Sequence, residues 1–411
     1  MRLDGHRTDR PLRHHRLQGP APVPGLRRPV RRVQGGVSVS LLVPRSGPAR
    51  PRHQFHDLVV TDREQLTDRA VALTFAVPDE LVGEFLRFEA GQHLTLRAQV
   101  GGEDVRQSYS LCLSPARARR MQAVRVGVGV VPGGRMSTHL NSVVDVGDSV
   151  AVMPALGGFV VPSEPESAKH HVLIAAGSGI TPVLSHVETI LTAEPQSRVT
   201  LFYGNRTTAD VMFLEELEGL KDEHLSRFQL VHVLSREPLA VELLSGRMDP
   251  PRLERLFEAF APVSGVDEFY LCGPFGMVEG ARGLLESLGV PGERVHHEVF
   301  HVPTADDLPD PVAVASAVAD AVVTVTLDGR TSRVEMADAT ESILDATLRV
   351  RPDAPYSCTG GMCGTCRARV ISGEVRMDRS YALEEDEIAA GMVLACQSHP
   401  VTDEVELTYD E

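Results

Sequence analysis

The stretch Tyr356-Ser-Cys358-Thr-Gly-Gly-Met-Cys363-Gly-Thr-Cys366 contains three cysteines in the spacing C-x4-C-x2-C, and a fourth, Cys396, lies well downstream. This is the plant-type spacing for the ligands of a [2Fe–2S] cluster. Four thiolates must converge on two irons, and the glycines let the backbone pass close to the inorganic sulfides, where a Cβ would collide. The alternatives are a disulfide pair or a zinc site, but zinc sites usually show two C-x2-C pairs and this stretch has one. We therefore predict a [2Fe–2S] cluster held by Cys358, Cys363, Cys366 and Cys396.

The composition is that of an ordinary globular protein. With 411 residues, 42% hydrophobic and 24% charged, the chain should form two to four domains. A net charge of −15 argues against general affinity for nucleic acid. No apolar run reaches transmembrane length without interruption, so we expect no membrane partner. The remaining cysteines, Cys112 and Cys272, lie far apart within apolar stretches. This usage fits a reducing compartment, and we expect a cytoplasmic protein.

Residues 1–52 differ in kind from the rest, with twelve arginines, no lysine, no glutamate and many prolines and glycines. A segment this polar and rich in proline cannot bury a hydrophobic core, so we interpret it as a disordered basic extension. One interpretation is that it is translated from upstream of the natural start. A twin-arginine signal is an alternative, but the apolar stretch after Arg31-Arg32 is short and ends at Pro44. A nucleic-acid-binding arm is another, although aromatic residues are missing.

Two sheet domains are expected next. Alternating apolar and polar residues at 93–97 and 124–130, separated by Pro and Gly turns, predict an antiparallel β-barrel over residues 53–163. Over residues 164–302, buried strands such as 172–176 alternate with helices, which predicts a doubly wound parallel sheet.

The C-terminal part should form a third domain. Residues 303–320 are rich in Pro, Ala and Asp and indicate a linker. In residues 321–411, a hairpin turning at Asp328-Gly329 and a helix over 342–348 precede the cluster loop.

Two motifs lie at strand ends of the expected parallel sheet. Ala176-Gly-Ser-Gly-Ile-Thr-Pro182 follows a strand and starts a helix, whose free N–H groups and dipole favour a pyrophosphate. Cys272-Gly-Pro274 ends another strand at the edge where such sheets bind ligands. The alternatives are a glycine that merely shapes a tight turn and a buried structural cysteine. The candidate residues for binding a ligand with a pyrophosphate at this edge are Gly177, Gly179, Thr181, Pro182, Cys272, Gly273 and Pro274.

The order of barrel, Gly-Ser-Gly-Ile-Thr-Pro, Cys-Gly-Pro and plant-type cysteine loop resembles the ferredoxin–NADP reductase superfamily with a C-terminal [2Fe–2S] domain. The resemblance covers nearly everything after residue 54 and implies FAD on the barrel, NAD(P)H on the parallel sheet and an α+β ferredoxin domain of the β-grasp type. Within the superfamily the chain most resembles reductases of phenylacetyl-CoA epoxidases, and steroid-hydroxylase reductases share most motifs. Three stretches carry the closer resemblance: 88–96, 203–207 and 383–391.

The resemblance also implies flavin-binding residues. The family motif Arg-x-Tyr-Ser is matched by Tyr109, expected to stack on the flavin, and Ser110, expected near its reactive N5. Gln107 stands at the arginine position and can still donate a hydrogen bond. Arg106, one residue earlier, is the other candidate for the phosphate contact, although it should lie on the opposite face of the strand.

Two further family positions concern the flavin. Gly133, Gly134, Met136 and Ser137 match the helix start that holds the pyrophosphate, with a simple hairpin turn as the alternative. Phe300 matches a position near the flavin ring, with core packing as the alternative.

Arg206 follows the second strand of the parallel sheet, where the adenosine ribose would lie, and a guanidinium matches the 2′-phosphate of NADPH. A solvated surface arginine is the alternative, and NADH remains possible. The acidic run 384–387 is either a solvated helix face or a docking patch for a basic partner.

The resemblance implies an oxidoreductase in which hydride from NAD(P)H reaches FAD, with Ser110 and Cys272 as catalytic residues, and the [2Fe–2S] cluster passes single electrons onward. The implied partner is an oxygenase, either a di-iron complex acting on phenylacetyl-CoA or a Rieske or steroid hydroxylase. Two alternatives from other functional classes are a redox-sensing binding module and a metal-free structural protein.

Overall fold

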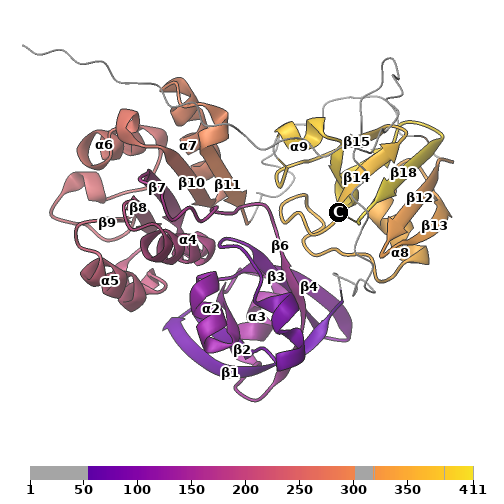
Figure 1. Cartoon of the computed structure of the whole chain (residues 1–411), viewed down its shortest axis with the longest axis horizontal. Coiled ribbons are helices and arrows are strands. Elements are labelled where there is room, and N and C mark those ends of the chain that lie inside the picture. Colours follow the sequence, from indigo (N-terminus) through magenta and orange to yellow (C-terminus); the bar gives the residue numbers. More distant parts are fainter. Residues whose placement is uncertain (1–53, 301–317, 319, 384, 411) are drawn as a thin grey trace, which may run out of the picture. The chain divides into compact units, whose positions relative to one another are not determined.

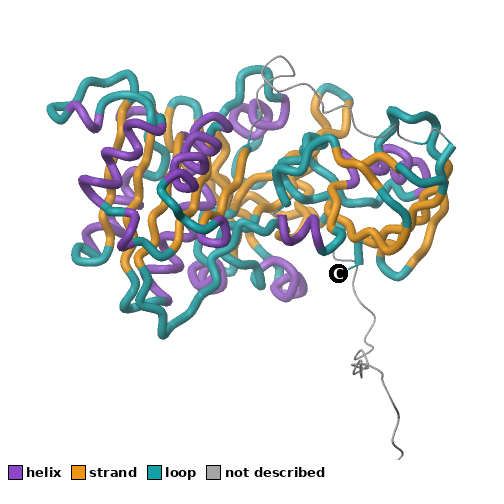
Figure 2. The backbone as a smooth tube through the Cα atoms, turned by 90° about the horizontal axis from the view of Figure 1, so that it is seen from above, coloured by secondary structure: helices purple, strands orange, loops and turns teal. Residues whose placement is uncertain are grey.

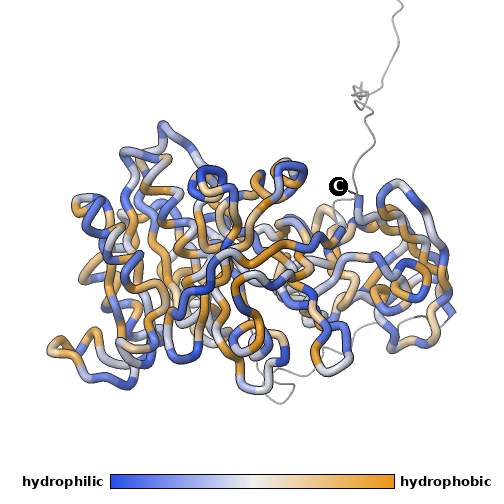
Figure 3. The backbone as a smooth tube through the Cα atoms, turned by 90° about the horizontal axis from the view of Figure 1, so that it is seen from below, coloured by the Kyte–Doolittle hydropathy of each residue, from blue (hydrophilic) through white to orange (hydrophobic). Residues whose placement is uncertain are grey.

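Three large β-sheets follow one another along the chain in the computed structural model, which describes residues 54–300, 318, 320–383 and 385–410. Figure 3 shows hydrophobic and hydrophilic segments alternating along the backbone. The expected extension over 1–52 and nearly all of the expected linker over 303–320 lie outside the described residues. The described residues form one compact unit. None of the helices in the described ranges is long and apolar enough to cross a membrane.

The first sheet is antiparallel, as predicted, with the strand order β4-β3-β6-β1-β2-β5. A bridge between Leu111 and Val126 connects the chain beyond β4 to β5, so the sheet curls back on itself. Val124, Val126 and Val128 point into the core, whereas Arg125 between them pairs with Glu64 and Glu216 outside it. The strands are β1 (His56–Thr67), β2 (Ala70–Ala76), β3 (His93–Val100), β4 (Glu103–Ser110), β5 (Ala123–Gly129) and β6 (Ser149–Leu156), and the helices are α1 (Val82–Phe85), α2 (Pro115–Met121) and α3 (Arg135–Ser142).

The second sheet is parallel, with the order β11-β10-β7-β8-β9, which confirms a doubly wound arrangement. The chain starts at the central β7, adds β8 and β9 on one side, and returns to add β10 and β11 on the other. Helices α4 and α5 share one hydrophobic core with the sheet, and α6 and α7 share another on the opposite face (Figures 1 and 2). The elements are β7 (His170–Ala176), α4 (Ile180–Ala193), β8 (Arg198–Asn205), α5 (Leu214–Glu223), β9 (Phe228–Leu234), α6 (Pro250–Phe260), β10 (Glu268–Gly273), α7 (Phe275–Ser287) and β11 (Val295–Val299).

The third sheet is mixed, with the order β13-β12-β18-β14-β16, and helix α8 packs into its core. The predicted hairpin is present: Asp328 and Gly329 both have positive φ, and Asp410 accepts their N–H groups. The predicted helix starts at its N-cap Ser342, whose hydroxyl accepts the N–H of Asp345. The elements are β12 (Val322–Leu327), β13 (Arg330–Glu335), α8 (Ile343–Val350), β14 (Arg367–Ser372), β15 (Val375–Met377), α9 (Glu385–Ala389), β16 (Met392–Leu394), β17 (Ser398–Pro400) and β18 (Glu404–Thr408).

Candidate functional site

The predicted cluster loop lies between α8 and β14, and the structure brings its four cysteines together. The thiols form two pairs, Cys358 with Cys363 and Cys366 with Cys396. Within the described ranges no three metal-binding side chains surround a single metal position. Two irons that are each held by two thiolates require just such a paired arrangement.

The backbone of the loop also fits an anionic cluster. Gly361 and Gly364 have positive φ, which turns the chain tightly. Backbone N–H groups of Gly360 and Met362 donate toward Cys358. The hydrogen bond from Cys363 is the main cause that lowers the pKa of the Cys358 thiol to about 6, and these N–H groups add to it. Donors aimed at sulfur stabilise thiolates and tune the potential of a cluster, so the loop fits a [2Fe–2S] group.

Strand β4 carries the expected flavin residues. The ring of Tyr109 packs beside the barrel core, and its hydroxyl is buried without a hydrogen-bond partner among the described residues. A buried, unpaired hydroxyl fits a site that a polar ligand completes. Arg106 lies on the opposite face of β4, where its guanidinium contacts Phe55 and Tyr356.

The expected pyrophosphate-binding segment is a turn followed by α3. Gly133 has a φ of +76°, which favours glycine. The side chains of Met136 and Ser137 point inward: Met136 belongs to the barrel core, and the Ser137 hydroxyl accepts the N–H of Val131. What remains available for phosphate is the backbone of this helix start, not these side chains.

The predicted dinucleotide turn joins β7 to α4, as expected. Gly177 has a φ of +54°, and its carbonyl accepts a hydrogen bond from the Tyr203 hydroxyl. A Cβ on Gly179 would lie 2.2 Å from the carbonyl oxygen of Cys272. Glycine is therefore needed because the helix start passes against the end of β10. Thr181 and Pro182 are buried in the first turn of α4, and the Thr181 hydroxyl donates to the carbonyl of Ser178.

Ser110 and Cys272, the two predicted catalytic residues, both lie next to Glu298. Glu298 pairs in register with Cys272 on the neighbouring strand, and the Ser110 hydroxyl donates to its carboxyl group over 3.4 Å. Burial raises the pKa of Glu298 to about 8 and the pKa of the Cys272 thiol well above its usual value. Both groups are therefore mainly protonated at neutral pH, and Cys272 is a neutral thiol rather than a nucleophile.

Glu298 was not among the residues predicted from the sequence. The available signal was a lone carboxylate at the end of β11, which, like β10, ends at the sheet edge where ligands bind. Phe300, two residues further on, is half-buried and packs against the core cluster that also contains Cys272.

Arg206 lies at the end of β8 as expected, but it forms an ion pair with Asp210. The N–H of Arg236, just beyond β9, donates to the Arg206 carbonyl over 2.7 Å. Arg236 is exposed, and within the described ranges no acidic side chain forms an ion pair with it. Two arginine residues therefore lie at adjacent strand ends, and only Arg206 was predicted from the sequence.

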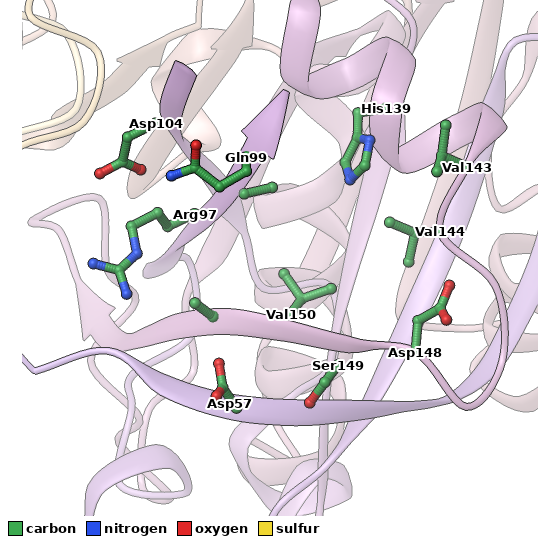
Figure 4. A pocket seen from close by; sticks show the side chains of 12 residues that line it. Asp57, Arg97, Gln99, Asp104, His139, Val143, Val144, Asp148, Ser149 and Val150 are labelled. Carbon is green, nitrogen blue, oxygen red and sulfur yellow. The ribbon is translucent and has the colours of Figure 1, made fainter. Parts of the chain in front are cut away.

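A wide hollow of about 620 Å³ lies elsewhere on the barrel. Figure 4 shows its mixed lining, with Arg97, His139 and three aspartates among the side chains. None of the predicted site residues lines it. The candidate site is instead the set of strand ends and loops described above.

Comparison with known proteins agrees with this geometry. Three family models match: an oxidoreductase FAD-binding domain over residues 57–160, an oxidoreductase NAD-binding domain over 173–283 and a 2Fe-2S iron-sulfur cluster binding domain over 325–401. One component of the 1,2-phenylacetyl-CoA epoxidase of Escherichia coli is 41% identical over 87% of this chain and 98% of its own length. This chain is a member of the ferredoxin–NADP reductase superfamily. Its cofactors are FAD, a pyridine nucleotide and a [2Fe–2S] cluster, and it is an electron-transfer reductase that serves an oxygenase.

Other members of the superfamily extend the comparison. The ferredoxin reductase component of 3-ketosteroid-9-alpha-monooxygenase from Mycobacterium tuberculosis is 36% identical over 86% of this chain and 96% of its own length. Among solved structures, phthalate dioxygenase reductase has a TM-score of 0.52 at 24% identity, covering 86% of this chain and 98% of that one. At this identity it shows that the fold is shared.

Proposed function

We propose that this reductase takes electrons from NADPH and delivers them to a di-iron oxygenase complex that epoxidises the ring of phenylacetyl-CoA. The observation that carries the proposal is the 41% identity with the epoxidase component, over 98% of the length of that protein. The cysteines outside the cluster, Cys112 and Cys272, are buried and unbridged, which supports a cytoplasmic location.

When bound, FAD would provide a group that accepts two electrons as a hydride, and the cluster would provide a group that passes electrons on one at a time. The residues of this chain bind these cofactors and orient them. We propose that the turn at Gly177 and Gly179 receives the pyrophosphate of NADPH through backbone N–H groups at the start of α4, with Thr181 and Pro182 shaping its first turn. Cys272, Gly273 and Pro274 at the end of β10 face the nicotinamide side of the same sheet edge.

The flavin side is assigned in the same way. Tyr109 supports the flavin ring, Gln107 lies on the same face of β4, and the backbone at Gly133 and Gly134 receives the pyrophosphate. Ser110 and Glu298 lie near the reacting edge of the flavin, where a protonated carboxyl can donate a hydrogen bond. Phe300 packs at this edge, against the core cluster of Cys272. No part of this assignment calls for a CoA site on the reductase, so the substrate binds the partner.

Reconstitution tests the proposal. The reductase is mixed anaerobically with the purified epoxidase complex, NADPH and phenylacetyl-CoA, and oxygen is then admitted. We expect an epoxide that depends on oxygen and on the reductase. A Cys396→Ala reductase, lacking one cluster ligand, is the matched control and should give no product.

The second candidate is the reductase of a steroid hydroxylase, favoured by 36% identity with the 3-ketosteroid monooxygenase component. The same assay with that oxygenase and a 3-ketosteroid separates the two. Turnover of the steroid without turnover of phenylacetyl-CoA would overturn the epoxidase assignment and leave the electron-transfer chemistry intact.

A further inference from the structure

Strand β4 carries different residues on its two faces, because successive side chains of a strand point in opposite directions. Gln107 and Tyr109 lie on the face assigned to the flavin. Arg106 and Ser108 lie on the other face, together with Ser110 at the end of the strand, and of these three the flavin assignment uses only Ser110.

The face with Arg106 contacts the cluster loop. The Arg106 guanidinium carbon lies 4.2 Å from the ring centroid of Tyr356 and 5.2 Å from that of Phe55. A guanidinium is planar and is attracted to the faces of aromatic rings, so one arginine can serve two rings. The Arg106 side chain is 9% exposed, and cation–π attraction is strongest where water is excluded.

Hydroxyl groups extend this contact beside Arg106. The Ser108 hydroxyl donates to the Ser357 hydroxyl over 2.9 Å and lies 3.4 Å from the Thr365 hydroxyl. The Nε2 atom of His93, on β3, lies 3.3 Å from the Thr365 hydroxyl. These groups are buried or half-buried, so each hydrogen bond satisfies an atom that water reaches poorly.

The contacted residues adjoin the cluster ligands. Ser357 directly precedes Cys358, and the Thr365 hydroxyl lies 3.1 Å from the sulfur of Cys363. On its other side, His93 Nδ1 lies 3.9 Å from the carboxyl group of Glu298. The contact thus joins the residues that hold the cluster to the residues that lie at the reacting edge of the flavin site.

We propose that Arg106, stacked between Phe55 and Tyr356, and Ser108, bonded to Ser357, are positioning residues that hold the cluster loop on the barrel for electron transfer within the chain. On this proposal Arg106 docks the cluster loop instead of binding a flavin phosphate. The proposal holds for any oxygenase partner, since it concerns the step before electrons leave the chain.

The test separates flavin reduction from cluster reduction. The holoenzyme and its variants are mixed anaerobically with NADPH in a stopped-flow spectrometer, which follows bleaching of the flavin and reduction of the cluster. In Tyr356→Leu and in Arg106→Leu we expect reduction of the cluster to slow about tenfold, the effect of losing one partly buried cation–π pair. Bleaching of the flavin in Tyr356→Leu should keep its wild-type rate.

Two matched controls accompany these variants. Tyr356→Phe keeps the ring and should transfer electrons at the wild-type rate. Arg97→Ala removes a guanidinium that also stacks on Phe55, 4.4 Å from its centroid, but does not stack on Tyr356 of the cluster loop. Arg97→Ala should therefore leave reduction of the cluster unchanged.

A double variant completes the test. Because Arg106 and Tyr356 act as one pair, the double variant should be no slower than either single variant, within about twofold. Independent, multiplying effects would overturn the proposal, as would unchanged cluster reduction in both single variants. Loss of FAD from Arg106→Leu would also overturn it and return Arg106 to the flavin site.

Iron content and the paramagnetic signal of the reduced cluster show whether Tyr356→Leu has lost its cluster. If it has, Ser108→Ala, on the barrel side, is measured in its place.

Discussion

At the scale of single residues, Glu298 connects groups that the sequence presents as unrelated. It lies between Ser110 of the barrel and Cys272 of the parallel sheet, with a side chain 12% exposed. Burial favours its neutral form over the carboxylate, which raises the pKa to about 8. A proton held at this position at neutral pH is therefore a product of the fold.

Glu298→Gln should reduce the dependence of stability on pH. The folded-state pKa of about 8 lies above the ordinary value of 4.5, so the folded state keeps a proton that the unfolded chain releases. This contribution is fully present below the unfolded pKa and is lost as the pH rises through about 8. At ~1.4 kcal/mol per pKa unit the effect amounts to a few kcal/mol. Urea unfolding at about pH 5 and about pH 8 measures it, and an equal pH dependence in wild type and variant would contradict the assignment.

Arg236→Ala should weaken selectivity for NADPH more than Arg206→Ala does. The ion pair with Asp210 already neutralises Arg206, whereas no acidic side chain of the described residues forms an ion pair with Arg236. Loss of a charged contact to the 2′-phosphate should lower kcat/KM for NADPH about ten- to hundredfold and leave that for NADH nearly unchanged. Steady-state kinetics with both nucleotides measures this. Equal efficiency of the wild-type enzyme with NADPH and NADH would refute both assignments.

At the scale of elements, the turn between β7 and α4 is fixed by the strand beside it. The start of α4 passes so close to the end of β10 that a Cβ at position 179 would meet the backbone of Cys272. The turn and the end of β10 are therefore one unit, and a change in either should disturb the nucleotide site formed by both.

Gly179→Ala should destabilise the protein by about 1–3 kcal/mol and weaken NADPH binding, because backbone atoms must shift. Gly283→Ala is the matched control: Gly283 lies in helix α7, with no atom near the position of an added Cβ. It should be neutral or stabilise the protein by up to about 1 kcal/mol, since alanine favours helix. Thermal unfolding and NADPH titration compare the two, and equal behaviour would show that the close approach is not required.

At the scale of the whole molecule, the cores of the barrel and the parallel sheet contain none of the cluster cysteines. Cys366 and Cys396 belong to the core of the third sheet. Removal of the cluster should therefore leave the nucleotide and flavin sites in place.

Cys396→Ala should abolish the paramagnetic signal of the cluster while NADPH still bleaches the flavin. Reduction of cytochrome c, if it receives its electrons from the cluster, should fall by roughly a hundredfold or more. Stopped-flow absorbance and electron paramagnetic resonance report the two steps separately. A variant that keeps full cytochrome c activity would show that electrons leave from the flavin.

The sequence by itself determined the cluster loop and the sheets, and FAD followed from the resemblance to a known superfamily. Cysteine spacing, glycine turns and strand periodicity are local properties, so they predicted the cluster, the dinucleotide turn and the order of the three sheets. Only the tertiary structure decided which side chains meet. Glu298 joined Ser110 and Cys272, and Arg106 met Tyr356, because strands far apart in sequence were brought to one place. The physical reason is that burial and contact depend on the packing of distant segments, which a local pattern does not contain.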